Sequence, residues 1–220
     1  MDKILLAKQI CARLSQKYPG AVCSLSYGGD PWRLLVMGRL SAQCTDERVN
    51  IVCPALFERY PDVYAMAEAE QDEIAKYIFS CGLYNSKARD LKAMSERIVT
   101  VYNGKVPDNM EDLLTLSGVG RKIANLILGD IFGKPAIVAD THCIRISARL
   151  GLCGDDIKPL SPEKTEKALS AIVEPGEQAA LCHRFVMFGR DVCSARSPSC
   201  DVCELSDICL KNHLDTNNKE

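Results

Sequence analysis

Residues 110–132 read MEDLLTLSGVGRKIANLILGDIF, and this stretch indicates how the chain folds. Residues 119–132 are apolar almost all round, which is typical of a helix buried in a core. Residues 110–115 predict a shorter helix before it. Gly118 and Gly120 lie one residue apart between the two, where they allow the backbone to turn tightly. The stretch therefore predicts two helices joined by a glycine hairpin.

The rest of the chain continues the helical pattern. Along residues 85–102 the apolar side chains recur at helical spacing, and an Asn-Gly pair closes the run. Ser161 followed by Pro162 predicts a capped helix start. Alternating strand patterns are nearly absent, so we predict an all-α protein. Further helices are expected at residues 4–18, 32–44, 46–60, a segment ending near 82, 141–150, 161–173 and 177–190, with a frayed polar tail at 215–220.

Composition is that of an ordinary globular protein, with 47% hydrophobic and 25% charged residues among 220. No stretch is apolar enough to span a membrane and the N-terminus lacks the features of a secretion signal, so we expect a cytoplasmic protein. The net charge is −2 and the pI about 6.0, which does not indicate a nucleic-acid binder. Residues 58–73 hold six acids and one base, however, so the remainder carries +3 and a basic face stays open.

The chain has twelve cysteines, which fall into two groups. In a reducing compartment they serve for burial, metal binding or chemistry rather than as disulfides. Eight are scattered through apolar patterns, and we expect most of them to be small buried hydrophobes. These eight are Cys11, Cys23, Cys44, Cys53, Cys81, Cys143, Cys153 and Cys182.

The other four cysteines are clustered, with the spacing Cys193-x6-Cys200-x2-Cys203-x5-Cys209. Four thiolates can hold either a structural zinc ion or an iron–sulfur cluster. Zinc sites usually present two close pairs, whereas this segment has one Cys-x2-Cys, so the spacing favours iron–sulfur and leaves zinc open. The segment is too polar for four unrelated buried thiols.

The hairpin carries a candidate nucleophile. Its amides point outward at the start of a helix, where an anion such as a DNA phosphate would fit. Lys122, next to Arg121, stands in the first turn of the apolar helix, where the positive helix end and partial desolvation disfavour the ammonium form. A more readily neutral amine is a candidate for Schiff-base chemistry. A lysine that merely contacts phosphate is an equally open interpretation.

Eighteen residues after Lys122, Asp140 follows a short apolar run and directly precedes a predicted helix. Its simplest role is the N-cap of that helix, which requires no chemistry. A capping carboxylate can also face a ligand, so the two roles are compatible.

Four motifs together resemble a known family. The hairpin Leu-Ser-Gly-Val-Gly-Arg-Lys, followed by Gly-Lys-Pro and then Asp140, resembles the helix-hairpin-helix (HhH-GPD) motif of DNA glycosylases. The cysteine spacing is similar to that of the endonuclease III branch. Two upstream segments match the same branch, LSAQCTD at residues 40–46 and GLYNSKA at residues 82–88. The resemblance covers nearly the whole chain in the right order.

The resemblance implies two helical lobes with DNA bound between them. One lobe would be a six-helix barrel over residues 21–132 that carries the hairpin. The other would combine residues 1–20 and 133–220 and hold a [4Fe–4S] cluster on Cys193, Cys200, Cys203 and Cys209. Lys122 and Asp140 would then face each other across the cleft. The expected partner is duplex DNA with oxidised pyrimidines or abasic sites. The protein is expected to be a monomer that acts at the nucleoid.

The resemblance also implies roles for single residues. Gln43 would fill the space left by an extruded nucleotide and Leu83 would wedge the opposite strand. Lys122 would attack the sugar C1′ with the help of Asp140, and β-elimination would cut the strand 3′ to the lesion. Thymine glycol and oxidised cytosines are the implied lesions. DNA contacts would come from Gly118, Gly120, Arg121, His142 and Arg196, with packing as the simpler role of His142.

Three departures bear on that resemblance. Ser117 stands where proline is usual, which predicts a slightly looser turn, and the cysteine loop carries one basic residue, Arg196. The low pI also predicts weaker or more salt-sensitive DNA binding. A monofunctional adenine glycosylase is disfavoured because Lys122 is present. A non-catalytic iron–sulfur sensor of DNA damage is the second alternative.

Overall fold

The computed structural model describes residues 2–217, and every regular element in that range is a helix. The prediction of an all-α protein is confirmed. The chain divides into two compact units. We call residues 23–132 the continuous unit, and residues 2–22 with 133–217 the two-segment unit. Within the described range, no helix has the length and apolar character needed to cross a membrane.

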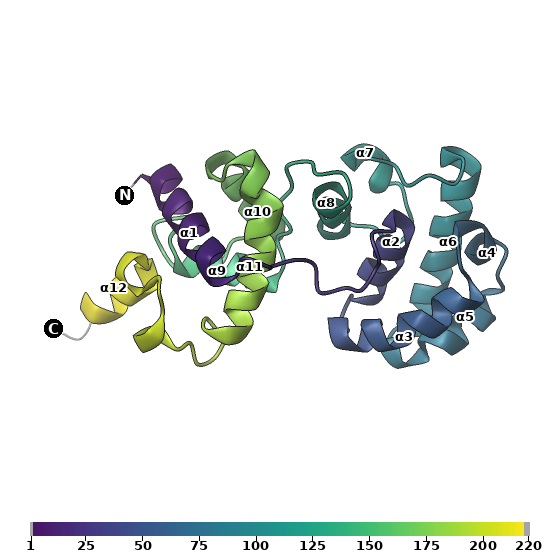
Figure 1. Ribbon diagram of the computed structural model, residues 1–220, viewed down its shortest axis with the longest axis horizontal. Coiled ribbons are helices and arrows are strands. Elements are labelled where there is room, and N and C mark those ends of the chain that lie inside the picture. Colours follow the sequence, from purple (N-terminus) through teal and green to yellow (C-terminus); the bar gives the residue numbers. More distant parts are fainter. Residues whose placement is uncertain (1, 218–220) are drawn as a thin grey trace. The chain divides into compact units, whose positions relative to one another are not determined.

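In the continuous unit, the long helix α6 (Tyr84–Tyr102) packs against three others (Figure 1). Its buried face includes Leu91, Met94 and Ile98, the positions that the helical spacing placed together. Helix α2 (Pro31–Leu40) joins α6 to α8 (Arg121–Asp130), the helix that follows the hairpin. The remaining elements are α3 (Asp46–Arg59), α4 (Val63–Ala67), α5 (Gln71–Ile78), η1 (Phe79–Cys81) and α7 (Met110–Leu113).

Short polar side chains start most helices of this unit by accepting a hydrogen bond from the first turn. Asp30 accepts from Arg33 N at 3.0 Å before α2. Thr45 and Asp62 do the same for α3 and α4. These caps satisfy amide groups that would otherwise lack a partner at a helix start.

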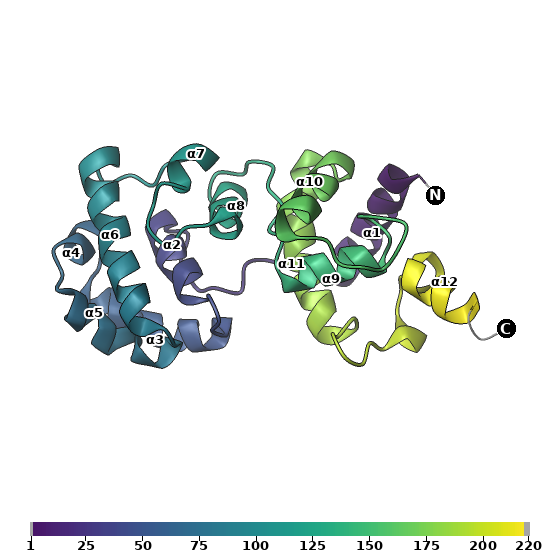
Figure 2. The same ribbon diagram turned by 180° about the vertical axis from the view of Figure 1, so that it is seen from behind.

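In the two-segment unit, α1 (Lys3–Lys17) and α9 (Thr141–Arg149) pack on α11 (Gln178–Asp191), as Figure 2 shows from behind. The core between them includes Ile10, Leu14 and Phe185, all fully buried. The unit also contains α10 (Pro162–Ile172), η2 (Pro175–Glu177), η3 (Cys200–Val202), η4 (Ser206–Ile208) and α12 (Leu210–Asn217). Helix α10 starts at Ser161, whose hydroxyl accepts from Lys164 N at 3.4 Å, as predicted.

The N-terminal helix is tied to the cysteine-rich loop by two charged pairs. Arg13 contacts Asp207 with both terminal nitrogens, at 2.5 and 2.9 Å. Lys17 contacts Glu204 at 2.5 Å. These contacts join the two ends of the chain in one unit.

Three helix boundaries differ from the predictions. The helix expected at 32–44 ends at Leu40, because the turn after it places Gln43 in the left-handed region at φ 55°. The single helix expected before residue 82 is two helices, α4 and α5, followed by η1. The expected tail at 215–220 begins inside α12, which continues to Asn217, and residues 218–220 lie outside the described range.

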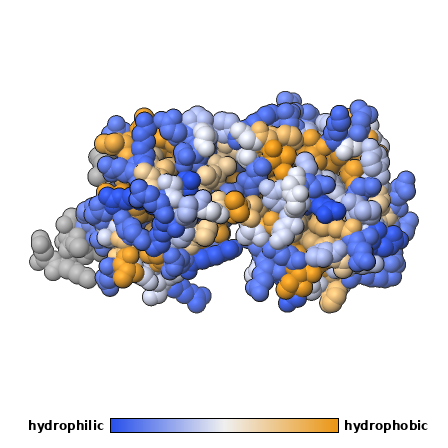
Figure 3. All heavy atoms as spheres, in the orientation of Figure 1, coloured by the Kyte–Doolittle hydropathy of each residue, from blue (hydrophilic) through white to orange (hydrophobic). Residues whose placement is uncertain are grey.

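Hydrophilic side chains predominate on the face shown in Figure 3, with hydrophobic ones interspersed. Three of the exposed large hydrophobic residues lie close together in the sequence. Phe79 is 68% exposed, Leu83 61% and Tyr84 40%. An apolar group in this position suggests a contact surface.

Candidate functional site

The hairpin connects α7 to α8. Gly118 adopts φ +74°, a conformation that glycine tolerates and other residues rarely adopt. Gly120 is the N-cap of α8 with φ −99°, and a Cβ placed there would meet no atom within 4 Å. Gly118 is therefore needed for the turn itself, whereas Gly120 leaves open space in front of the helix start.

Lys122 is the second residue of α8 and is exposed, as is Arg121 before it. The expected partial desolvation of Lys122 is not found within the continuous unit. The apolar residues of α8 follow Lys122 directly, and Ala124 and Ile127 among them are fully buried. The helix is thus anchored by its inner face and presents the amine to solvent.

The hairpin packs on a buried ion pair between α2 and α6. Arg39 on α2 donates to Asp90 Oδ2 on α6 from Nε at 2.9 Å and from Nη2 at 2.7 Å. Ser117 donates to the other oxygen, Asp90 Oδ1, at 3.0 Å. The side chains of Arg39 and Asp90 are only 13% and 9% exposed. Ser117 therefore ties the turn to α6, in contrast to the looser turn expected from its replacement of proline.

Asp140 belongs to the two-segment unit and caps α9. Its Oδ1 accepts from Cys143 N at 2.8 Å, so the capping role is confirmed. His142 Nδ1 lies 3.7 Å from Asp140 Oδ2. The Asp140 side chain keeps 17% exposure, so the cap also reaches solvent.

Gln43 and Leu83 both occupy tight turns of the continuous unit. Gln43 has φ 55° and Leu83 has φ 47°, two of the three non-glycine residues with positive φ in the described chain. Both side chains are exposed. Held in a sparsely populated conformation, each is presented outward rather than packed into the core.

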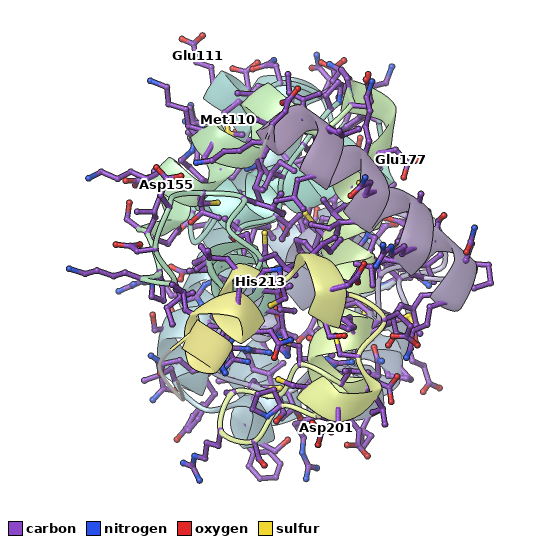
Figure 4. The ribbon with its side chains drawn as sticks, turned by 90° about the vertical axis from the view of Figure 1, so that its left-hand side faces the viewer. Met110, Glu111, Asp155, Glu177, Asp201 and His213 are labelled. Atoms are coloured by element: carbon purple, nitrogen blue, oxygen red, sulfur yellow. The ribbon has the colours of Figure 1, made fainter. Side chains whose placement is uncertain are left out.

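The four clustered cysteines line a single cavity in the two-segment unit, with about 390 Å³ of space free of protein atoms. All four are free thiols and only partly buried. Helix α12 and η3 border this region, and their residues His213 and Asp201 face the viewer in Figure 4. The donor set suits an iron–sulfur cluster, whose iron atoms are held by cysteine thiolates. No three described His, Cys, Asp or Glu residues are grouped to hold a single metal ion.

Two arginines of α9 hold the start of this loop. Arg149 donates to Cys193 Sγ at 3.2 Å and to the carbonyls of Ser194 and Ala195 at 2.7 and 2.8 Å. Arg145 donates to the Cys193 carbonyl at 3.1 Å. The helix capped by Asp140 therefore also positions the first cysteine. Arg196, next in the loop, is exposed.

Burial raises the pKa of the Cys203 and Cys209 thiols. Because an iron–sulfur cluster is held by thiolates, these two cysteines would have to give up their protons to hold it.

Of the eight scattered cysteines, five are buried as expected. Cys23, Cys44 and Cys153 are partly exposed. The role of small buried hydrophobe is confirmed for most of the eight.

Comparison with known proteins identifies the family. Residues 36–175 match the model of the HhH-GPD superfamily base excision DNA repair protein. Residues 193–209, which begin and end at cysteines of the clustered set, match the iron-sulfur binding domain of endonuclease III. The chain belongs to the endonuclease III family. It is a DNA glycosylase of base excision repair, and its cofactor is a [4Fe–4S] cluster.

Similarity extends over nearly the full length of its endonuclease III relatives. The chain is 44% identical to endonuclease III of Synechocystis sp., covering 92% of this chain and 91% of that one. It is 40% identical to the Bacillus subtilis endonuclease III, with 90% and 88% covered. A solved structure of a trapped endonuclease III–DNA covalent intermediate matches with a TM-score of 0.89 and 36% identity, covering 98% of this chain and 99% of that one.

Sequence reasoning missed the residues that support the site. Lys87 and Asp90 lie on the buried side of α6, and Arg145 and Arg149 lie on α9. One signal was available for Lys87, because it precedes the apolar Leu91 by one helical turn and so falls on the core-facing stripe. A charged residue on such a stripe indicates a buried polar contact.

Proposed function

We propose that this endonuclease III family member is a bifunctional enzyme, a DNA glycosylase and AP lyase that removes oxidised pyrimidines from duplex DNA. The observation that carries the proposal is the exposed Lys122 amine in the first turn of α8, directly behind the glycine hairpin. An amine at this place is accessible to a sugar bound at the helix start, and lysine forms Schiff bases with carbonyl carbons.

The hairpin would bind the DNA backbone without reading sequence. The amides at the start of α8 would form an anion site, and a Cβ at Gly120 would meet no atom within 4 Å, so the backbone there is open to a phosphate. Arg121 adds positive charge beside it. Because such contacts neutralise phosphate charge, binding should weaken as salt increases.

Gln43 and Leu83 would enter the duplex when the damaged nucleotide is extruded. Extrusion costs a few kcal/mol, and less where damage has already weakened pairing. The Gln43 amide can hydrogen-bond to the orphaned base, and the exposed Leu83 can replace lost stacking. Phe79 and Tyr84 extend the exposed apolar surface around Leu83.

The chemical step is nucleophilic substitution at the sugar followed by elimination. The lone pair of a neutral Lys122 Nζ forms a bond to C1′ while the bond to the base breaks and its electrons leave with the base. Asp140 takes the proton from the amine or stabilises positive charge on the sugar. The nitrogen lone pair then forms the C1′=N bond while the C1′–O4′ bond breaks and O4′ takes a proton. The resulting ring-opened Schiff base makes the C2′ proton acidic, and its removal expels the 3′ phosphate.

Cys193, Cys200, Cys203 and Cys209 would hold the cluster, and Arg196 would contact phosphate from the same loop. The cluster supplies a rigid support for this loop and takes no part in the chemistry on the base. His142, beside Asp140, would contact DNA or orient the carboxylate. We expect a monomer that works on chromosomal DNA.

Product analysis tests this function. A duplex with one thymine glycol and a 5′ label is incubated with holoenzyme, Lys122→Gln and Asp140→Asn. The expected product is a strand ending in a 3′ unsaturated aldehyde, absent with Lys122→Gln. Release of base with an intact strand would instead indicate a monofunctional glycosylase. Binding without either product would indicate a non-catalytic sensor of DNA damage.

A further inference from the structure

Lys87 is fully buried in the continuous unit, with 0% of its surface exposed. An ammonium group loses favourable hydration when it is buried, so it persists only with strong acceptors. Its Nζ donates to the Leu40 carbonyl at 2.8 Å and to the Cys81 carbonyl at 2.6 Å. The residue therefore joins two segments that are far apart in the sequence.

Both acceptors stand at the end of a helix. Leu40 is the last residue of α2, and Cys81 is the last residue of η1. Carbonyls in a final helical turn lack partners within the helix, and that of Leu40 also lies at the negative end of the dipole of α2. A single buried cation satisfies both ends at once.

Burial is the main influence on the charge of Lys87, and its net effect is to lower the pKa of the amine. Desolvation lowers its pKa, while the neighbouring thiols of Cys44 and Cys81 raise it. Replacing the amine removes the donor and leaves two buried carbonyls without that partner, which is more costly than the bonds themselves are stabilising.

Each acceptor immediately precedes one of the two exposed turns. Leu40 lies three residues before Gln43, and Cys81 lies two residues before Leu83. Both turn residues have positive φ. Because each connection is only two or three residues long, a shift of the carbonyl that Lys87 holds would also move the turn. Lys87 itself belongs to the first turn of α6, which starts directly after Leu83.

We propose that Lys87 is a positioning residue that fixes the turns of Gln43 and Leu83 relative to each other, so that both side chains enter DNA together. The inference rests on the proposed function, which assigns these two residues to the duplex. Lys87 is fully buried and so is not placed to contact DNA. It acts through two backbone carbonyls, and its removal should impair extrusion of a paired nucleotide more than chemistry at an unpaired one.

The test compares two substrates for borohydride trapping with holoenzyme. One is a duplex with a single thymine glycol, in which a paired nucleotide must be extruded. The other is a single-stranded oligonucleotide with an abasic site, in which it need not be. Lys87→Met keeps the length of the side chain and removes the donors. Lys92→Met, on the same helix, removes an ammonium 3.9 Å from Glu96 and serves as the control.

For Lys87→Met we expect trapping on the duplex to slow by about 10- to 100-fold, as misplaced binding groups do. Trapping on the single strand should stay within about twofold. Lys92→Met should match the parent on both substrates, because a single partly exposed pair at 3.9 Å contributes little. Hydrogen exchange should accelerate at residues 41–44 and 79–84 and remain unchanged at the end of α6. Lys87→Arg, which keeps a donor, should recover part of the duplex rate.

Equal slowing on both substrates, or no slowing on the duplex, would overturn the positioning role. Unchanged hydrogen exchange at both turns would also overturn the positioning role, even if Lys87→Met is too poorly folded to be active. Failure of the parent to trap on either substrate has a different meaning: it would refute the proposed lyase function, and the inference with it.

Discussion

Gly118→Ala is the change that probes the hairpin most sharply. At φ +74° an alanine adopts a left-handed backbone, which costs about 1–2 kcal/mol. Its Cβ would lie 2.5 Å from Arg39 Nε and 3.0 Å from Asp90 Cβ, so something must move. Arg39 cannot move freely, because two of its nitrogens donate hydrogen bonds to Asp90.

The magnitude depends on what happens to that ion pair. Removing one partner of a buried pair costs about 3–5 kcal/mol, and displacing Arg39 recovers some of this through solvent. Together with the strain, we expect Gly118→Ala to lower the free energy of unfolding by about 3–5 kcal/mol. Urea unfolding followed by circular dichroism measures this loss. Anisotropy of a labelled undamaged duplex should show weaker binding at the same time.

Gly120→Ala is the matched control in the same hairpin. Its Cβ meets nothing within 4 Å, so the loss should stay at or below about 1 kcal/mol, the difference between glycine and alanine as an N-cap. Weaker DNA binding is still expected, because the methyl group occupies the space assigned to a phosphate. If Gly118→Ala is no more destabilising than Gly120→Ala, the close packing of the hairpin on the Arg39–Asp90 pair does not contribute to the stability of the fold.

Three further predictions follow from the two units. The free energy of unfolding of Asp140→Asn should lie within about 0.5 kcal/mol of the parent's, because asparagine caps a helix as well as aspartate does. The variant should nevertheless lose excision activity, and retained excision would exclude the carboxylate from the reaction. Arg149→Met should lose its visible cluster absorbance faster than the parent when challenged with a chelator, since Cys193 and the next two residues lose a shared donor; equal rates would show that the arginine does not hold the loop. Burial raises the pKa of the Cys53 thiol to about 12, so its contribution to stability is complete below about pH 9 and is lost as pH rises toward 12, by at most about 1.4 kcal/mol per pH unit. Urea unfolding of Cys53→Val should show a shallower loss at high pH, and an identical slope would contradict this.

The sequence predicted the helices whose borders carry a chemical signal. The predicted caps Asp140 and Ser161 each fall at an observed helix start. Residues 61–82 were harder, because α4 is only five residues long and shows too little of the helical period to be distinguished. Its start at Asp62 was nevertheless visible as a capping residue.

The candidate site was predictable in its motifs but not in its supports. The glycines of the hairpin and the spaced cysteines are local patterns that can be read along the chain. The bonds of Asp90 to Arg39 and Ser117 join residues 51 and 27 positions apart, and those of Lys87 to Leu40 join residues 47 apart. Such pairings depend on how helices pack, and no local pattern specifies them.

The central claim is that the Lys122 amine forms the bond to the sugar. Holoenzyme is incubated with a thymine glycol duplex, reduced with borohydride and digested, and the peptide that carries the nucleotide remnant is identified by mass spectrometry. The account predicts the added mass on Lys122 and no adduct with Lys122→Gln. An adduct on another residue, or one formed equally well by the variant, would contradict it.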